Sequence, residues 1–303
     1  MTDYTHLPVM PRDCLDGLNI KPDGTYIDGT VGLGGHAELI CERLHGGRFI
    51  GLDKDAQALK RAETRLARFD GVTLIKEDFR RLEYALEGVK ADGILLDIGV
   101  SSMQLDDASR GFSYRFDAPL DMRMDNTQEL TAAVIVNTYS QNEIRRILHE
   151  YGEERFASRL AAAIVRARPL ETTFELCDTI KAAMPSSREK QHPARRTFQA
   201  LRIAVNDELG ALSDALDGAV KVLAPGGRLC VISFHSLEDR LVKTRFKEMA
   251  CDCVCPPDFP ACVCGKKASG KVMGSRPPSR EEIDENPRSE CARLRVFETA
   301  LRR

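Results

Sequence analysis

The chain contains no tryptophan, and aromatic residues make up only 6% of its 303 residues. Stacking on a base would therefore fall to phenylalanine, tyrosine, histidine or arginine. An excess of one charge is also missing, because 44 basic and 46 acidic residues leave a net charge of −2 and no global field that attracts a polyanion. No apolar run is long enough to span a bilayer, and residues 1–19 do not form a signal peptide. We expect a soluble, cytoplasmic protein without a membrane partner.

Cysteine is abundant, but its distribution excludes a secreted disulfide framework. Of the ten cysteines, five gather within residues 251–264 and the others are scattered singly. The gathered residues are Cys251, Cys253, Cys255, Cys262 and Cys264. Five thiols exceed the four that a structural zinc ion needs, but they are spaced Cys-x-Cys rather than with the usual longer separation. A zinc site and a metal-free loop both stay open, and a reducing cytosol favours metal over disulfides.

Short apolar runs alternate with amphipathic patterns in the N-terminal third of the chain. The apolar runs predict strands at residues 25–28, 48–52, 72–76 and 93–98. The patterns between them predict helices at residues 36–44, 55–68 and 80–87. Strands that alternate with helices usually form a parallel sheet with helices on its faces, so we predict an α/β fold.

Strand signals stop at about residue 105, and only helical patterns follow until about residue 205. Two capping boxes indicate helix starts in this stretch, Ser140 with Glu143 and Thr172 with Glu175. The α/β pattern then resumes with a helix at 209–223, a turn at 224–227 and strands at 228–234 and 294–299. We therefore predict a core built from residues 1–105 and 206–303, interrupted by a helical insertion over residues 106–205.

A glycine-rich loop follows the first predicted strand. Residues 28–36 are Asp-Gly-Thr-Val-Gly-Leu-Gly-Gly-His, which places four glycines within seven residues. Glycine lets a backbone turn sharply and approach a ligand closely. Asp53 ends the second predicted strand, 21 residues after Gly32, and this spacing is typical of a loop and a carboxylate that hold a nucleoside by its ribose hydroxyls. The sequence therefore predicts a nucleotide-like cofactor.

Three features favour S-adenosylmethionine over NAD or a nucleoside triphosphate. Asp53, Asp78 and Asp97 follow three successive predicted strands and could serve the ribose, the adenine amine and the cationic methionine end. The loop lacks the lysine and hydroxyl residue of a phosphate-binding loop. Ala37 interrupts the dinucleotide pattern, and Asp28 would repel a pyrophosphate. The alternative is a tight turn without a ligand, with the acids acting as helix caps.

Nine strings of residues resemble one protein family. They lie at residues 6–9, 28–36, 96–106, 110–113, 119–125, 151–155, 192–202, 232–240 and 286–289. The strings extend over nearly the whole chain and resemble the bacterial ribosomal RNA small subunit methyltransferase H family, also called the MraW family. Met103 and Arg195 depart from the residues common there, and these departures bear on substrate contacts rather than on the cofactor.

The resemblance implies a class I, Rossmann-like methyltransferase core with an inserted all-helical domain that recognises RNA. It implies S-adenosyl-L-methionine as cofactor, 16S rRNA or the small ribosomal subunit as partner, and methylation of the exocyclic N4 of a cytidine in the decoding region. By analogy it also suggests a homodimer. The implied cofactor contacts are Gly34, Gly35, His36, Asp53, Phe79, Asp97 and Gln104. Asp53 and Asp97 were also reached from spacing alone, whereas Phe79 and Gln104 come from the family.

Cytosine N4 is a poor nucleophile because its lone pair is delocalised into the ring. An enzyme must hold it in line with the methyl group and place acceptors on the amine hydrogens, where positive charge develops. Other amino-methyltransferases place such acceptors directly after the fourth strand, and here that position offers Asp97, Ser101 and Ser102. We assign catalysis to these three residues. The alternative for Asp97 is that it only holds the cofactor.

Basic residues are candidates for the rRNA surface, with Arg195 and Arg196 foremost, although a basic helix face is often simply solvated. The wider basic group comprises Arg188, Lys190, His192, Arg202, Arg276, Arg280, Arg288, Arg293 and Arg295. His235 and Ser236 follow a predicted strand, so they either line the base pocket or Ser236 caps the next helix. His36 either binds the cofactor carboxylate or caps its own helix.

Two other classes of protein compete with this interpretation. An NAD-dependent oxidoreductase would use the same glycine loop, and an rRNA assembly factor would use the same fold without catalysis. A DNA amino-methyltransferase is disfavoured, because the chain lacks the Pro-Pro-Tyr type of sequence that those enzymes carry.

Overall fold

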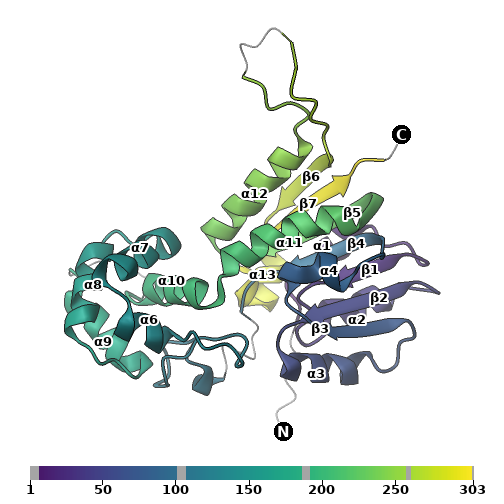
Figure 1. Cartoon of the computed structure of the whole chain (residues 1–303). Helices are drawn as coiled ribbons and strands as arrows, with labels where there is room; N and C mark the ends of the chain where they lie inside the picture. Colours follow the sequence, from purple (N-terminus) through teal and green to yellow (C-terminus); the bar gives the residue numbers. More distant parts are fainter. Residues whose placement is uncertain (1–6, 101–106, 186–191, 257–260, 302–303) are drawn as a thin grey trace. The chain divides into compact units, whose positions relative to one another are not determined.

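The computed structural model describes residues 7–100, 107–185, 192–256 and 261–301. The chain divides into two compact units, and Figure 1 shows their helices and strands. The first unit comprises Met1–Gly99 with Leu209–Arg303, and the second comprises Val100–Glu208. Among the described residues, no helix is long and apolar enough to cross a membrane.

The first unit is built on a seven-stranded sheet in the order β3-β2-β1-β4-β5-β7-β6. Its strands are β1 (Thr25–Asp28), β2 (Arg48–Asp53), β3 (Val72–Lys76), β4 (Ala91–Asp97), β5 (Leu223–Ser233), β6 (Gly270–Arg276) and β7 (Arg293–Thr299). The first five are parallel, whereas β7 runs antiparallel to both β5 and β6. The order reverses between β1 and β4, and open sheets of this kind bind ligands at that switch point.

Helices cover both faces of the sheet, and each face has its own hydrophobic core. One face carries α4 (Leu82–Ala85), α11 (Glu208–Val222) and α12 (Ser236–Ala250), which contribute Leu82, Leu216 and Phe246. The other carries α1 (Pro11–Leu18), α2 (Gly35–Cys41) and α3 (Ala56–Leu66), which contribute Leu18, Ile40 and Leu66. Covering both faces explains why the central strands are almost continuously apolar. The predicted α/β, Rossmann-like class with a helical insertion is confirmed.

The second unit is helical. Its helices are α6 (Ala132–Thr138), α7 (Gln141–Gly152), α8 (Ala157–Arg166), α9 (Thr173–Ala183) and α10 (Arg195–Asn206). They enclose one core that includes Ile144, Leu160 and Leu201. Both predicted capping boxes are confirmed, at the start of α7 and at the start of α9. Gly152 lets α7 lie close to α10, because a Cβ there would be 2.8 Å from the carbonyl oxygen of Arg196.

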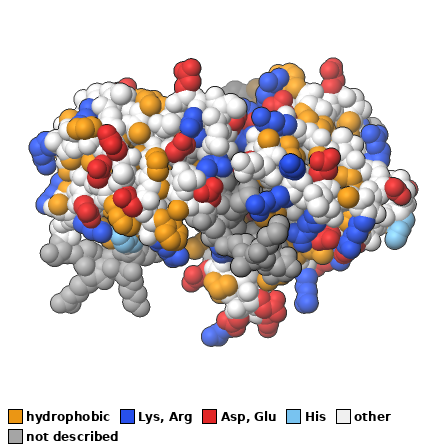
Figure 2. All heavy atoms as spheres, turned by 90° about the horizontal axis from the view of Figure 1, so that it is seen from below, with side chains coloured by type: hydrophobic (Ala, Val, Ile, Leu, Met, Phe, Trp, Pro, Cys, Tyr) orange, Lys and Arg blue, Asp and Glu red, His pale blue; other side chains and the backbone are white. Residues whose placement is uncertain are grey.

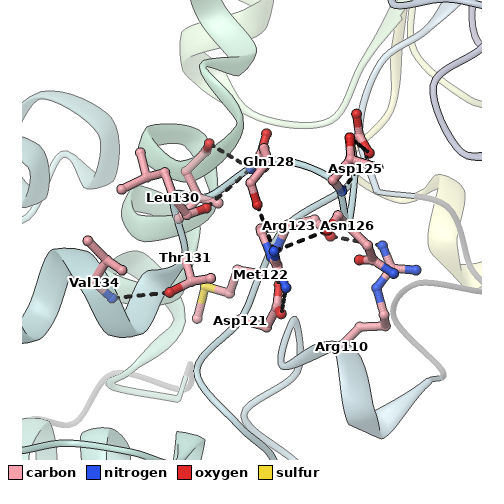
Figure 3. Close-up of polar contacts among 12 residues, drawn as sticks. Arg110, Asp121, Met122, Arg123, Asp125, Asn126, Gln128, Leu130, Thr131 and Val134 are labelled. Carbon is pink, nitrogen blue, oxygen red and sulfur yellow. Dashed lines mark hydrogen bonds and ion pairs between the residues drawn. The ribbon is translucent and has the colours of Figure 1, made fainter.

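An irregular segment, residues 107–131, leads into α6 and is fixed by the side chain of Arg123 (Figure 3). Arg123 Nε and Nη2 donate to the two carboxylate oxygens of Asp121 at 2.9 and 2.7 Å. Its Nη1 donates to the carbonyl oxygens of Asn126 and Gln128 at 3.2 and 2.6 Å. Charge-assisted bonds of this kind are about twice as strong as neutral ones, so Arg123 holds the segment without regular secondary structure.

Two more polar side chains fasten the same segment. Arg110 Nη2 donates to the carbonyl oxygens of Arg123 and Met124 at 2.8 and 3.1 Å. Asn206, at the end of α10, accepts from the Met124 N–H at 2.7 Å and donates to the Met122 carbonyl at 2.8 Å. The polar residues of the family-like string at 119–125 therefore have a structural use within the second unit.

Three parts of the fold differ from the sequence-based prediction. Helix α1 was not predicted, because Cys14, Gly17 and Leu18 are its only buried residues and are too few to create a pattern. Strand β6 was not predicted either, since it is exposed almost throughout and forms through pairing with β7 rather than through burial. The predicted helix at 80–87 is a short 3₁₀ turn, η1 (Phe79–Arg81), followed by the single turn of α4. A last short helix, α13 (Arg280–Glu285), precedes β7.

Candidate functional site

The glycine loop after β1 lies across the carboxyl end of β4. The Gly29 N–H donates to the carbonyl oxygen of Leu95 at 2.9 Å. A Cβ at position 29 would lie 2.5 Å from Leu96 Cδ2, so a larger residue would push the loop off the strand. Gly34 has a φ of +79°, a left-handed conformation that favours glycine, and it is the N-cap of α2. The loop is thus fixed at the switch point of the sheet.

Asp28 and Asp97 end the two central strands, β1 and β4, and Thr30 links them. Asp28 Oδ1 accepts from the Thr30 N–H at 3.0 Å and from its hydroxyl at 3.3 Å. The same hydroxyl oxygen accepts from the Asp97 N–H at 2.7 Å. Asp28 is only 1% exposed, and burial raises the pKa of its carboxyl to about 6. Two acidic side chains are therefore held together at the edge where a ligand is expected.

His36 lies in the first turn of α2 and faces Asp97. Its Nε2 is 3.7 Å from Asp97 Oδ2, which is too long for a hydrogen bond. Within the part of the chain that the structure describes, His36 Nε2 and Asp97 Oδ1 are buried and have no hydrogen-bond partner. Burial opposes a charge on the imidazole, but the carboxylates of Asp97 and Asp28 outweigh burial and raise the pKa of His36. Buried polar atoms without partners need an explanation, and a bound ligand would supply the missing bonds.

The hypothesis that His36 caps its helix is wrong, because Gly34 is the N-cap of α2 and no side chain caps it. Gly35 is the first residue of that helix, and a Cβ there would lie 3.4 Å from Pro8. Three predicted site residues, Ser101, Ser102 and Gln104, lie outside the described residues.

Asp53 ends β2 and orients the glycine loop. Its two carboxylate oxygens accept from the N–H groups of Gly32 at 2.9 Å and Asp55 at 2.8 Å. Burial raises the pKa of Asp53 despite these bonds. Each carboxylate oxygen can accept more than one bond, so Asp53 keeps capacity for ligand hydroxyls. Helix α3 is capped by Asp55 instead, which accepts from the Gln57 N–H at 2.9 Å.

The acid after β3 has a different use. Asp78 caps η1 by accepting from the Arg80 N–H at 2.9 Å, so the helix-cap alternative holds for this residue. Phe79, the next residue, lies beside the glycine loop, because a Cβ at Gly29 would be 3.3 Å from Phe79 Cβ. Phe79 is half-buried against the core of the sheet. The structure thus brings Phe79, but not the Asp78 carboxylate, to the loop.

His235, rather than Ser236, caps α12. The His235 imidazole accepts from the Glu238 N–H at 3.4 Å, and the Glu238 carboxylate accepts from the Phe234 and His235 N–H groups at 2.8 and 3.3 Å. Ser236 is the exposed first residue of the helix, so the hypothesis that Ser236 caps α12 is wrong. Ring geometry made His235 the cap, and cap preferences favour serine, so the sequence gave no signal for it.

The basic group is more internally engaged than the sequence suggested. Arg195 is exposed and Arg196 half-buried at the start of α10. Arg202, on the same helix, instead donates twice to the Glu208 carboxylate, at 2.8 and 2.7 Å. Arg295 forms a similar double bond with Asp239, at 2.7 and 2.9 Å. On the face shown in Figure 2, basic and acidic side chains are interspersed, in keeping with the net charge of −2.

Two phenylalanines proposed for base stacking have different surroundings. Phe112 is 7% exposed and belongs to the core of the second unit, which favours the packing alternative for it. Phe116 is 48% exposed. Tyr114, which the sequence did not single out, stacks face to face on His192 with ring centres 4.5 Å apart.

The residues at the strand ends fit S-adenosylmethionine better than a dinucleotide. The site offers carboxylates at Asp28, Asp53 and Asp97, which suit hydroxyls and positive charge and would repel a pyrophosphate. His36 supplies a buried nitrogen without a partner among the described residues, and its raised pKa suits a ligand carboxylate. The backbone turn at Gly34 leaves the start of α2 open to the ligand, because only 3.5 Å contacts with Ala62 limit that position.

A sheet of this order, with a glycine loop after β1 and an acid at the end of β2, defines a class I methyltransferase that uses S-adenosylmethionine. A family model described as the MraW methylase family matches residues 3–300. The chain is 55% identical to the ribosomal RNA small subunit methyltransferase H of Heliobacterium mobile, over 97% of this chain and 98% of that protein. It is also 55% identical to the protein of the same name from Symbiobacterium thermophilum, over 97% and 96% of the two chains. The chain belongs to the MraW methylase family.

Proposed function

We propose that this chain transfers a methyl group from S-adenosylmethionine to the exocyclic N4 of a cytidine in the decoding region of 16S rRNA. One observation carries the proposal: His36 Nε2 and Asp97 Oδ1, buried and unpartnered among the described residues, lie at the switch point of the sheet. The printed names of the relatives support rRNA of the small subunit as the substrate. The N4 position rests on the sequence resemblance.

The bound cofactor would supply a methyl group activated by a sulfonium. Asp53 would accept from the ribose hydroxyls with the lone pairs that Gly32 and Asp55 leave free. His36, together with Gly34 and Gly35, would hold the methionine carboxylate, since the nearby acids favour its charged form. Phe79 would give an apolar contact beside the loop.

Asp97 is placed to act on the substrate amine. Its side chain is 24% exposed, so a base could reach it, and Oδ1 has no partner among the residues that the structure describes. A carboxylate oxygen that accepts from the amine would orient N4 and stabilise the charge that develops on it. Ser101 and Ser102 would assist from the segment that follows. The extra proton can pass to water afterwards, so no dedicated base is required.

The second unit would position the RNA. Arg195 and Arg196 at the start of α10 would contact phosphates, which fix the register of a nucleic acid without reading its bases. His235 and Ser236, after β5, would line the pocket for an extruded base. A homodimer is part of this proposal by analogy alone.

The proposal is tested by deleting the gene and analysing the 16S rRNA nucleosides by mass spectrometry. One N4-methylated cytidine should disappear and return when the gene is restored. An unchanged methylcytidine content would make the chain an rRNA assembly factor without this activity. Methylation assays with purified protein on naked 16S rRNA and on assembled small subunits would then identify the form of the substrate.

Calorimetry separates the methyltransferase from an oxidoreductase. We expect binding heat with S-adenosylmethionine and none with NAD, because the acids at the strand ends disfavour a pyrophosphate. The reverse result would overturn the assignment of the cofactor.

A further inference from the structure

The segment between α12 and β6 has no apolar interior to hold it. Its described residues, 251–256 and 261–269, form no helix or strand, and none of them is buried. Figure 1 shows the chain running out from the end of α12 and returning to β6. The base of the segment is closed by the Ser269 N–H, which donates to the Met249 carbonyl at 2.8 Å. Beyond this base, hydrophobic burial cannot fix the chain, and small units of this kind usually need a disulfide or a metal.

Four thiols converge in this segment from two Cys-x-Cys pairs. The sulfurs of Cys253, Cys255, Cys262 and Cys264 all lie within 4.8 Å of one another. Cys262 Sγ is 3.5 Å from Cys253 Sγ and 3.6 Å from Cys264 Sγ, and the two last-named sulfurs are 4.0 Å apart. Tetrahedral zinc with bonds of about 2.3 Å requires its sulfur ligands to be about 3.8 Å apart. A disulfide would require about 2.05 Å, and all the cysteines are free.

The two pairs face each other with an approximate two-fold relation. The Val254 N–H, between the first two cysteines, donates to Cys264 Sγ at 3.5 Å. The Val263 N–H, between the other two, donates to Cys255 Sγ at 3.5 Å. Each middle residue thus donates to the second sulfur of the opposite pair. Backbone donors aimed at sulfur are the outer contacts that orient the ligands of a metal site.

Side-chain burial does not explain this arrangement. The two valines are 63% and 72% exposed, whereas the sulfurs beside them turn toward one another. A segment that folded around apolar side chains would do the opposite. The fifth thiol is excluded from the group, because Cys251 Sγ donates to the Cys253 carbonyl oxygen at 2.6 Å. Four ligands remain, which is the number that a closed structural zinc site uses.

We propose that Cys253, Cys255, Cys262 and Cys264 bind one zinc ion as a structural tetrathiolate site. On binding, the four thiols release their protons to solvent and the sulfurs become the ligands. With four protein ligands the ion has no open position, so it shapes the segment and takes no part in methyl transfer. The site is independent of the proposed rRNA substrate.

Metal analysis of the full chain tests the site. Protein prepared without chelators should contain one zinc ion per chain by elemental mass spectrometry. Cys253→Ser and Cys264→Ser should each lose it, whereas the matched controls Cys251→Ser and Cys291→Ser should keep it. Cobalt substituted for zinc should show the charge-transfer and ligand-field absorption of a tetrahedral tetrathiolate.

A second measurement avoids the variants and therefore does not depend on their folding. A thiol reagent applied to the native wild-type chain should find four more reactive thiols after treatment with a strong chelator than before. A chain that stays metal-free when refolded with zinc under reducing conditions would overturn the proposal. So would iron in place of zinc, zinc retained by both Cys253→Ser and Cys264→Ser, or an unchanged thiol count.

Discussion

The carboxyl edge of the sheet and the segment of residues 107–131 in the second unit both concentrate charged side chains, but they use them differently. In the segment, the Arg123 guanidinium donates to Asp121 and to two carbonyl oxygens, so its hydrogen-bonding capacity is spent inside the fold. At the sheet edge, His36 Nε2 and Asp97 Oδ1 stay without partners among the described residues. Burial also raises the pKa of Asp28 to about 6 there.

The difference separates structural charges from functional ones. Charged groups that partner inside the fold fix a segment that has no regular secondary structure. Charged groups that are buried without full partners destabilise the free chain and persist where a ligand completes them. Both regions contain strings that resemble the family, so the resemblance alone does not tell them apart. The hydrogen-bond partners do.

The largest effect is expected from Asp97→Asn, which keeps the shape of the side chain and removes its charge. Methyl transfer at saturating cofactor should fall by on the order of a hundredfold or more, because an acceptor on the developing positive charge is lost. Single-turnover assays measure the rate, and calorimetry measures cofactor affinity. A rate loss at unchanged affinity identifies Asp97 as the amine acceptor, whereas weaker binding alone identifies a cofactor ligand.

Asp92→Asn is the matched control, since Asp92 lies on the same strand and pairs with Lys21 at 2.8 Å. It should leave the rate unchanged. A wild-type rate for Asp97→Asn at saturating cofactor would remove Asp97 from the chemistry.

Asp28→Asn tests whether the sheet edge destabilises the free chain. The raised pKa of Asp28 means that the folded state binds a proton more tightly than the unfolded chain between about pH 4 and about pH 6. Stability from this group is therefore present in acid and lost as the pH rises through about 6. At neutral pH the variant should be more stable by up to about 3 kcal/mol, as 1.36 kcal/mol per pKa unit implies.

Urea unfolding of both proteins across pH 4.5–7.5 measures the effect, in a range chosen to span about 6. The gap should shrink as the pH falls. The raised pKa of His36 acts with the same sign, because its charge is favoured beside Asp28 and Asp97 in the folded state. Asp23→Asn, at an exposed acid before β1, should show no such gap. A gap independent of pH would contradict the burial argument.

Asp53→Ala should weaken S-adenosylmethionine binding by about 2 kcal/mol, or roughly thirtyfold, because bonds to a charged acceptor are strong. Asp55→Ala is the control, since it removes the cap of α3 at the neighbouring position and should cost about 1 kcal/mol of stability. Its cofactor affinity should not change. Calorimetry at one pH compares the three proteins, and equal affinities would place the ribose elsewhere.

The smallest effect concerns the second unit. Arg195→Glu with Arg196→Glu should weaken rRNA binding by about tenfold and reduce the salt dependence by about two charges, while cofactor binding stays intact. The adjacent exposed pair in α7, Arg145→Glu with Arg146→Glu, changes the charge equally and controls for a general field effect. Filter binding at several salt concentrations distinguishes them. Equal losses from both pairs would show that α10 has no special role.

The sheet and its acidic strand ends were largely predictable because local physics determines them. Strands covered on both faces must be apolar, and the chain turns polar where each one ends, as at Asp53 and Asp97. Capping boxes such as Ser140 with Glu143 are also local, so they were found. Strand β6 was not found, because only its pairing with β7 makes it a strand.

The state of individual polar groups could not be predicted. The sequence does not show that Arg202 is paired with Glu208, since that pairing depends on the turn between α10 and α11. It does not show that His235 replaces Ser236 as the cap of α12. Nor does it show which of five cysteines converge, because that requires the path of the whole segment.

The central claim is that the ends of β1, β2 and β4 hold the methyl donor. A crystal structure of the chain with S-adenosylhomocysteine tests it directly. The account predicts the ligand against Asp53, with His36 Nε2 or Asp97 Oδ1 bonded to it. A ligand bound elsewhere on the chain, with both of these atoms as they are now, would contradict it.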